Sequence, residues 1–162
     1  MALFVHITSE RDGRRIAKSG LSTHRTRYPD IPFAIFAVPV VPNFTLSHQW
    51  VRELKRQGQK LMSGVYFRIP DDEQVYVGHY HHLHQWMTAA ESVAKMMREL
   101  DARGFEVLIP RAIPTSSIQQ VRILPHVGWR YYPNAHHHRP CPCPMCLRRG
   151  EIKSKRIRQK YG

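Results

Sequence analysis

The chain has few acidic residues, few cysteines and no long apolar segment. Only 12 Asp and Glu stand against 25 Lys and Arg, so the formal net charge is +13 over 162 residues. No apolar run approaches the roughly 20 residues that a membrane span needs, and Thr8 to Arg11 interrupt the apolar start too early for a signal peptide. We therefore expect a cytoplasmic protein with no membrane partner, and its positive field favours nucleic acid as the partner.

The cysteines are confined to one short motif. All three lie in Cys141-Pro-Cys143-Pro-Met-Cys146, and an odd cluster without a secretory signal is a poor disulfide framework. Three thiolates at this spacing, together with a histidine of the 136–138 run such as His138, match a tetrahedral structural zinc site. We expect zinc to fasten the tail to the body without an open catalytic position; a reduced, metal-free, proline-rich loop is the alternative.

The positive charge is concentrated at the C-terminus. Residues Arg139–Gly162 hold eight Lys and Arg, one acidic residue and few large apolar residues. This composition predicts two parts, a folded body (1–133) and a Cys/His-containing basic tail (134–162). A merely solubilising tail is the alternative to one that binds nucleic acid. The cations expected to contact phosphates are Arg148, Arg149, Lys153, Lys155, Arg156 and Arg158.

Strand and helix patterns alternate irregularly in the body, which predicts an α+β fold. Prolines at 39 and 42 suggest that the strand at 33–41 lies at a sheet edge, and the acidic turn 70–73 suggests a hairpin between its flanking strands. The predicted strands cover 3–7, 33–41, 65–69, 75–79, 105–109 and 120–124, and the predicted helices cover 9–18, 45–57 and 88–103.

Glu106 is the first candidate for a functional side chain. It lies within the apolar strand 105–109, on the strand face that it shares with Leu108. A carboxylate in such a place is desolvated unless a partner stabilises it, and this environment is typical of tuned functional groups. A strand face open to water is the alternative.

Several short motifs together resemble a known superfamily. They are Phe4-Val-His6-Ile-Thr8, the helix end Ser19-Gly20-Leu21, Gly64-Val-Tyr66-Phe67, and the segment from Glu106 to Ile118. This set resembles the ADP-ribosyltransferase superfamily, and the Glu106 segment looks like that of DarT-type enzymes, which ADP-ribosylate DNA. The resemblance covers a little under half of the chain. It implies a small split-sheet α+β core and NAD as a substrate.

The resemblance also implies roles for individual residues. Glu106 would be catalytic, and the product would be ADP-ribosylated nucleic acid or a nucleic-acid-associated protein. Arg11, Arg14, Arg15, Arg25 or Arg27 would bind the pyrophosphate. Arg25 and Arg27 are also the stand-ins for the arginine that DarT-type enzymes use after the first helix. The NAD-binding residues would be His6 and Thr8 at the adenosine-side ribose, Tyr66 with Tyr80 (or Tyr76 in its place) at the nicotinamide, and Arg25.

Other readings stay open. A zinc-containing nucleic-acid-binding protein without catalysis would make Glu106 structural, and an NAD-using RNA 2′-phosphotransferase would share the fold. The histidines between His79 and His84 are read as a surface loop or part of the cleft rather than a second metal site. The resemblance to a toxin family also leaves open a protein partner such as an antitoxin.

Overall fold

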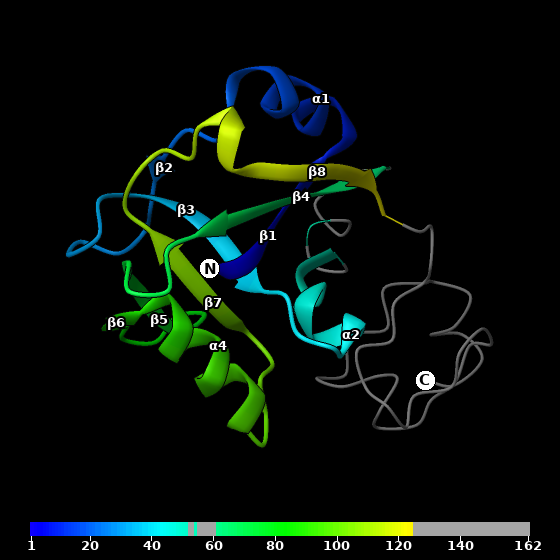
Figure 1. Cartoon of the computed structure of the whole chain (residues 1–162). Coiled ribbons are helices and arrows are strands. Elements are labelled where there is room, and N and C mark those ends of the chain that lie inside the picture. The colour runs from blue at the N-terminus through cyan, green and yellow to red at the C-terminus, as the bar shows by residue number, and fades with distance from the viewer. Residues whose placement is uncertain (52–53, 55–60, 125–162) are drawn as a thin grey trace, which may run out of the picture. The chain divides into compact units, whose positions relative to one another are not determined.

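The computed structural model describes residues 1–51, 54 and 61–124 (Figure 1). Within them the strands form an antiparallel sheet in the order β6-β5-β7-β3-β1-β4-β8, and β2 pairs with β3. This arrangement confirms the α+β class. The strands are β1 (Ala2–Ser9), β2 (His24–Arg25), β3 (Phe33–Pro39), β4 (Met62–Ile69), β5 (Gln74–His79), β6 (Gln85–Thr88), β7 (Phe105–Ile109) and β8 (Ile118–Ile123).

The helices begin where the sequence supplies a capping side chain. The helix α1 (Glu10–Ser19) begins after Ser9, whose hydroxyl accepts a hydrogen bond from the Asp12 amide. The helix α4 (Ala89–Arg98) begins after Thr88, which forms a capping box with Glu91. The short helix α2 (Phe44–Ser47) lies between β3 and β4, and the 3-10 turn η1 (Thr115–Ser117) precedes β8.

The sheet consists of two groups of strands joined by a short contact. One group is β1, β4 and β8, and the other is β3, β7, β5 and β6. Between β1 and β3 the paired residues are Phe4 with Pro39 and Val5 with Val38, whereas β1 and β4 pair along eight residues. Helix α1 packs on β4 and β8, and α4 packs on β5 and β6 (Figure 1). The core therefore extends across both groups.

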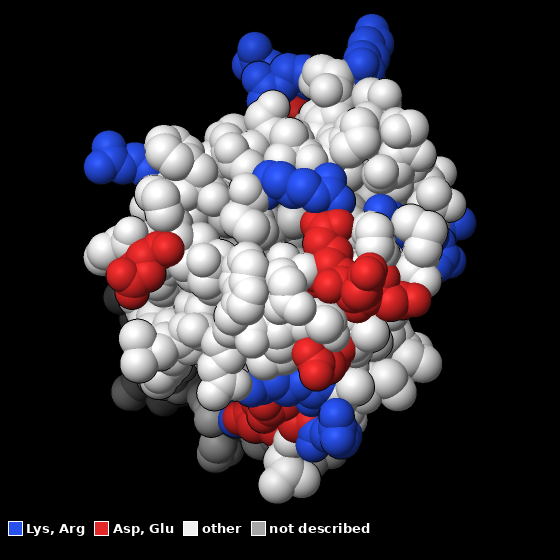
Figure 2. Space-filling view, turned by 60° about the vertical axis from the view of Figure 1, so that its left-hand side comes forward, with Lys and Arg blue, Asp and Glu red and all other residues white. Residues whose placement is uncertain are grey.

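Large apolar side chains from both groups form the core. The fully buried ones include Phe4, Phe67, Phe105, Ile35, Ile69, Leu108 and Ile109. At about 25 cal/mol per Å² of buried apolar surface, such residues supply the main free energy of folding. Figure 2 shows one face of the molecule, on which acidic side chains gather beside basic ones and much of the surface is uncharged.

Three sequence-based expectations about the fold are wrong. Strand β3 is not an edge strand but lies between β7 and β1. An interior strand can contain Pro39 because this proline is the last residue of β3, where its missing N–H does not interrupt a long ladder. Strands β4 and β5 form no hairpin, since β4 pairs with β1 and β8 while β5 pairs with β6 and β7. Helix α4 ends at Arg98 rather than at residue 103, because Glu99 is already extended.

The strands predicted at 3–7, 105–109 and 120–124 are confirmed as β1, β7 and β8, with bounds that differ by at most a few residues. The helix predicted over 45–57 begins as α2 at Phe44 but is interrupted, because α2 ends at Ser47 and a turn at 48–49 follows; residues 52, 53 and 55–57 lie outside the described residues. The predicted boundary at residue 133 lies outside them as well.

Candidate functional site

Glu106 is a buried carboxylate in the middle of a β-ladder. It lies on β7, which pairs with β3 on one side and β5 on the other. Glu106 is only 3% exposed to solvent. The Tyr28 hydroxyl donates a 2.5 Å hydrogen bond to its Oε1. Nε2 of His84 lies 3.1 Å from the same oxygen. Oε1 of the carboxylate is therefore held by a loop tyrosine and a histidine that are both distant in the sequence.

The two oxygens of Glu106 differ in their surroundings. Both donors reach Oε1, whereas no hydrogen bond from any residue of the described part of the chain reaches Oε2. An ionised carboxylate has about four acceptor positions, and buried acceptors are normally filled. Oε2 thus differs from Oε1 in having no donor among the described residues.

Burial sets the protonation of this group. It raises the pKa of Glu106, while the hydrogen bond from Tyr28 and the charge of Arg27 act in the opposite direction. Burial and the hydrogen bond to Glu106 raise the pKa of Tyr28 to about 12, so Tyr28 stays a donor. Burial lowers the pKa of His84 and so favours the neutral imidazole, of which the tautomer with its proton on Nε2 can donate to the ionised carboxylate.

The loop between β2 and β3 places Tyr28. Its turn closes through hydrogen bonds from the Ile31 amide to the Tyr28 carbonyl (3.0 Å) and from the Tyr28 amide to the Thr26 hydroxyl (3.0 Å). The Tyr28 ring packs on a small cluster of Ile31, Ala34 and Leu108. The same apolar contact that orders the loop therefore brings the hydroxyl to Glu106.

A group of aromatic and cationic side chains lies beside this carboxylate. The Arg27 guanidinium is 4.3 Å from the centre of the Tyr80 ring, and its Nη1 donates to the Tyr80 hydroxyl at 2.5 Å. The ring of Trp50 is 5.4 Å from that of Tyr80, and Trp50 Nε1 donates to the Phe105 carbonyl at 3.0 Å. We call Arg27, Trp50 and Tyr80 the aromatic–arginine cluster. The cluster is thus hydrogen-bonded, through Trp50, to Phe105, the residue before Glu106.

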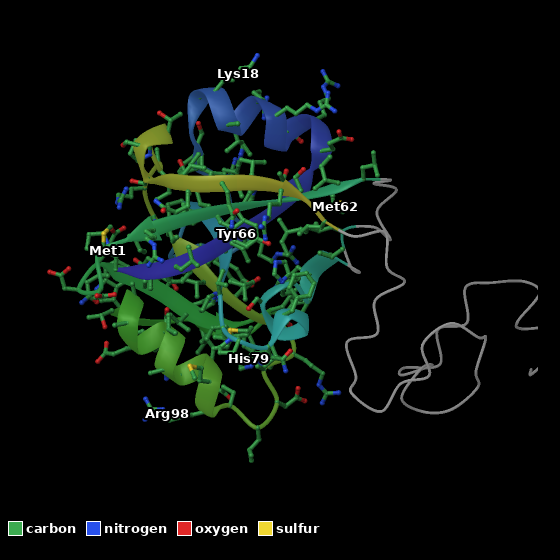
Figure 3. All side chains as sticks on the ribbon, turned by 45° about the vertical axis from the view of Figure 1, so that its right-hand side comes forward. Met1, Lys18, Met62, Tyr66, His79 and Arg98 are labelled. Carbon is green, nitrogen blue, oxygen red and sulfur yellow. The ribbon has the colours of Figure 1, made fainter. Side chains whose placement is uncertain are left out.

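Tyr66 forms a second buried polar contact. Its hydroxyl donates to Nε2 of His48 at 2.7 Å, because Nδ1 of His48 already donates to the Phe44 carbonyl at 2.8 Å. Burial lowers the pKa of His48 and raises that of Tyr66, which keeps both groups neutral. Figure 3 shows Tyr66 on β4, the strand between β1 and the edge strand β8.

Strand register places Tyr66 and Glu106 on the same sheet face. Tyr66 pairs with Val5, and Val5 with Val38. Phe36, two residues before Val38, pairs with Leu108, which lies two residues after Glu106. Three strand spacings separate β4 from β7, or about 14 Å. The two side chains are therefore too far apart for a direct contact, and the residues between them on this face, Val5 and Val38, are buried.

His6 and Thr8 point toward the other face. In the β1–β4 ladder His6 pairs with Val65 and Thr8 with Ser63, one residue out of phase with Tyr66. Helix α1 packs on this other face, where Gly13 lies against Ser63. The His6 ring sits where the β1–β3 ladder ends, and its Nδ1 donates to the Phe36 carbonyl at 2.7 Å. Burial lowers the His6 pKa.

The predicted NAD-binding residues are thus brought together only in part. Tyr80 is hydrogen-bonded to Arg27, and the next residue, Tyr28, is hydrogen-bonded to Glu106. Tyr66 lies on the same sheet face as Glu106. The ladder does not bring His6 and Thr8 to that face. Arg25 is exposed on β2, where it pairs with Phe33, and the neighbouring Arg27 is the arginine in the cluster.

Sequence reasoning missed Tyr28 and His48, and it did not single out His84 from its histidine group, whose reading as a surface loop is wrong for the buried His84 side chain. Tyr28 follows two arginines in a loop without a strand or helix pattern, and His84 is one of several histidines of similar appearance. The signal that could have found His84 is Gly78, a glycine inside a strand, which often marks the close approach of another group. The described residues include no cluster of three or more groups suited to hold a metal.

The predicted zinc ligands Cys141, Cys143, Cys146 and His138 lie outside the described residues, as do the basic residues from Arg148 to Arg158. No helix in the described ranges is long and apolar enough to cross a membrane. Comparison with protein-family models, curated proteins and solved structures found no match to this chain.

Proposed function

We propose that this protein transfers ADP-ribose from NAD to nucleic acid, with Glu106 as the catalytic residue. The observation that carries the proposal is the buried Glu106 carboxylate, whose Oε1 is held by two donors while Oε2 receives none from the described residues. A desolvated carboxylate with one unused oxygen is suited to bind a ligand hydroxyl and to face a developing positive charge.

The reaction would need such a group. The bond between the nicotinamide nitrogen and the ribose carbon breaks, and its electron pair leaves with nicotinamide. The ribose carbon gains oxocarbenium character, as in glycoside hydrolysis. Oε2 of Glu106 would accept a hydrogen bond from a ribose hydroxyl and offset this charge. A nitrogen or oxygen of the nucleic acid then bonds to the ribose carbon and loses its proton to solvent.

The surroundings of Glu106 support an acceptor of this kind. The aromatic–arginine cluster places an exposed cation against aromatic rings at the edge of the site, a combination that suits the phosphate and base of a nucleic acid. The basic tail would add phosphate contacts without sequence readout. Zinc at Cys141, Cys143, Cys146 and His138 would serve to fold the start of that tail.

A transfer assay tests the proposal. The full chain is incubated with single-stranded oligonucleotide and NAD labelled in its adenylate phosphate, and both label transfer and nicotinamide release are measured. Removing the charge in Glu106→Gln should lower both rates by about 10²-fold or more. Asp30→Asn, an exposed carboxylate on the Tyr28 loop, is the matched control and should stay near the parent rate.

Two outcomes would overturn the assignment. Undiminished transfer by Glu106→Gln would remove Glu106 from the chemistry. Oligonucleotide binding by the parent without nicotinamide release, with DNA or RNA as the acceptor, would favour the binding protein without catalysis.

A further inference from the structure

Gly78 provides a place for His84 beside Glu106. Gly78 lies on β5 directly opposite Glu106 in the β5–β7 ladder. A Cβ atom at Gly78 would lie 2.9 Å from Cδ2 of His84 and 2.9 Å from the Leu83 carbonyl oxygen. Distances this short do not occur in real structures, and one of the two atoms belongs to the backbone. Only glycine therefore lets the His84 ring and its loop lie against β5 at this position.

The imidazole is enclosed on several sides. Its side chain is 2% exposed, and that of Glu106 is 4% exposed. The Tyr28 ring meets it edge-on with the ring centres 4.4 Å apart. Nε2 faces Oε1 of Glu106 at 3.1 Å. Close packing leaves the His84 ring little freedom to rotate, so Nε2 is held in its direction toward Oε1.

The loop that carries His84 is itself well defined. It connects β5 to β6, and Val77 pairs with Gln85 at its base. The His82 amide donates to the His79 carbonyl at 2.9 Å, and the Tyr80 amide donates to the Gly104 carbonyl at 2.8 Å. His81 adopts a positive φ of 67°, a conformation that costs free energy in a residue with a side chain. The loop that passes over Gly78 therefore includes one residue, His81, in an unfavourable backbone conformation.

These contacts decide which carboxylate oxygen is free. With His84 and Tyr28 both on Oε1, rotation of the Glu106 carboxylate would break two hydrogen bonds. We infer that His84, packed over Gly78, is a positioning residue that holds Oε1 of Glu106 and so directs Oε2 to the hydroxyl of a bound ligand. This inference rests on the proposed function, and it adds a residue that touches neither NAD nor acceptor.

Kinetics of three His84-loop variants test the role. His84→Ala removes the donor, His84→Gln keeps an N–H donor near the Nε2 position, and His82→Ala is the control because His82 is exposed in the same loop. For nicotinamide release, His84→Ala should lower kcat by about 10²-fold while the KM for NAD changes little. His84→Gln should recover most of the loss, and His82→Ala should behave as the parent.

The pH profile separates positioning from general structural damage. The groups that face His84 are Glu106, Tyr28, His79 and, beyond them, Arg27. Loss of the Nε2–H donor destabilises the carboxylate anion, so the acid limb of the kcat/KM profile should move to higher pH in His84→Ala. A merely destabilised variant would lose active protein without moving that limb. Gly78→Ala should show the same shift, because its Cβ displaces His84.

The outcomes distinguish this inference from the proposed function. If the parent and Asp30→Asn release nicotinamide but His84→Ala has the parent kcat and pH profile, the positioning role is overturned while the function stands. An equal loss in His84→Gln and His84→Ala, with no shift of the acid limb, also overturns it. If the parent releases no nicotinamide, the proposed function fails first.

Discussion

The Tyr66 hydroxyl donates a 2.7 Å hydrogen bond to Nε2 of His48, and this bond ties the middle of β4 to the turn that follows α2. The Phe44 carbonyl fixes the tautomer by accepting from Nδ1, and the Phe44 ring stacks on the imidazole at 3.9 Å. Protonation of His48 would turn Nε2 into a donor and oblige the Tyr66 hydroxyl to rotate. The contact is therefore specific for neutral histidine.

Acid should weaken the fold through this histidine. Its pKa is lowered in the folded state by burial, so its contribution to stability is present above the ordinary histidine value of about 6.5 and is lost as the pH falls. We expect the free energy of unfolding of the parent to fall between pH 7.5 and 5. In His48→Gln the fall should be smaller, as measured by urea unfolding. Equal slopes in the two proteins would contradict the prediction.

The contribution of the Tyr66–His48 hydrogen bond to the free energy of unfolding can be measured separately. Tyr66→Phe leaves Nε2 of buried His48 without a donor, which should cost about 1–3 kcal/mol at pH 7.5. Because the Phe ring keeps the packing, the loss reports the hydroxyl. The loss should shrink in the His48→Gln background, and a double-mutant cycle by urea unfolding measures this coupling. Additive losses would show that the two side chains act independently.

Glu106 should lower stability at neutral pH. Its pKa is raised by burial, so the protonated form supplies stability that is present below the ordinary carboxyl value and lost as the pH rises through the folded value. Glu106→Gln does not titrate, so its stability relative to the parent should increase from pH 4 to pH 7.5. Urea midpoints at the two pH values test this, with Asp30→Asn as the charge control. If the stability of Glu106→Gln relative to the parent falls between pH 4 and pH 7.5, the prediction is wrong.

The sequence predicted those elements whose signals are local. Ser9 and Thr88 mark helix starts because a capping hydroxyl acts within three residues. Phe105–Ile109 is recognisable from its apolar composition alone. The pairing of β4 with β1 rather than with β5 is not local, since it depends on which ladder buries more apolar surface. For that reason the predicted hairpin failed.

The candidate site shows the same division. Glu106 stood out because an acidic residue interrupts an apolar strand. Its partners Tyr28 and His84 come from loops, where no periodic pattern exists, and are 78 and 22 residues away in the chain. The sequence could not predict that His6 and Tyr66 point to opposite faces of the sheet either. A shift of one residue in strand register reverses the face to which each side chain points.

Thr88 provides a simple test of the α4 start. Its hydroxyl accepts from the Glu91 amide, and the Glu91 carboxylate accepts from the Thr88 amide at 2.8 Å. Thr88→Ala removes the cap and should cost about 1 kcal/mol of unfolding free energy. Thr88→Ser keeps the hydroxyl and should cost less than half as much. Equal losses would show that the methyl group of Thr88, not the cap, matters.

Gly20 and Gly104 form a matched pair for measuring crowding. Both have a φ of 79°, which disfavours any residue with a side chain. At Gly104 the nearest atoms to an added Cβ are 3.8 Å away, whereas at Gly20 the Ile113 carbonyl oxygen would lie at 2.5 Å. That carbonyl also accepts from the Leu21 amide at 2.9 Å, within an isolated β-bridge.

The two alanine substitutions should therefore differ. Gly104→Ala carries only the backbone cost of about 1–2 kcal/mol, while Gly20→Ala adds a clash that the chain can relieve only by opening the Leu21–Ile113 bridge. We expect Gly20→Ala to lose more unfolding free energy than Gly104→Ala, and the Leu21 amide to lose protection in hydrogen exchange. Equal losses with full protection of Leu21 would mean that η1 and the end of α1 move apart without cost.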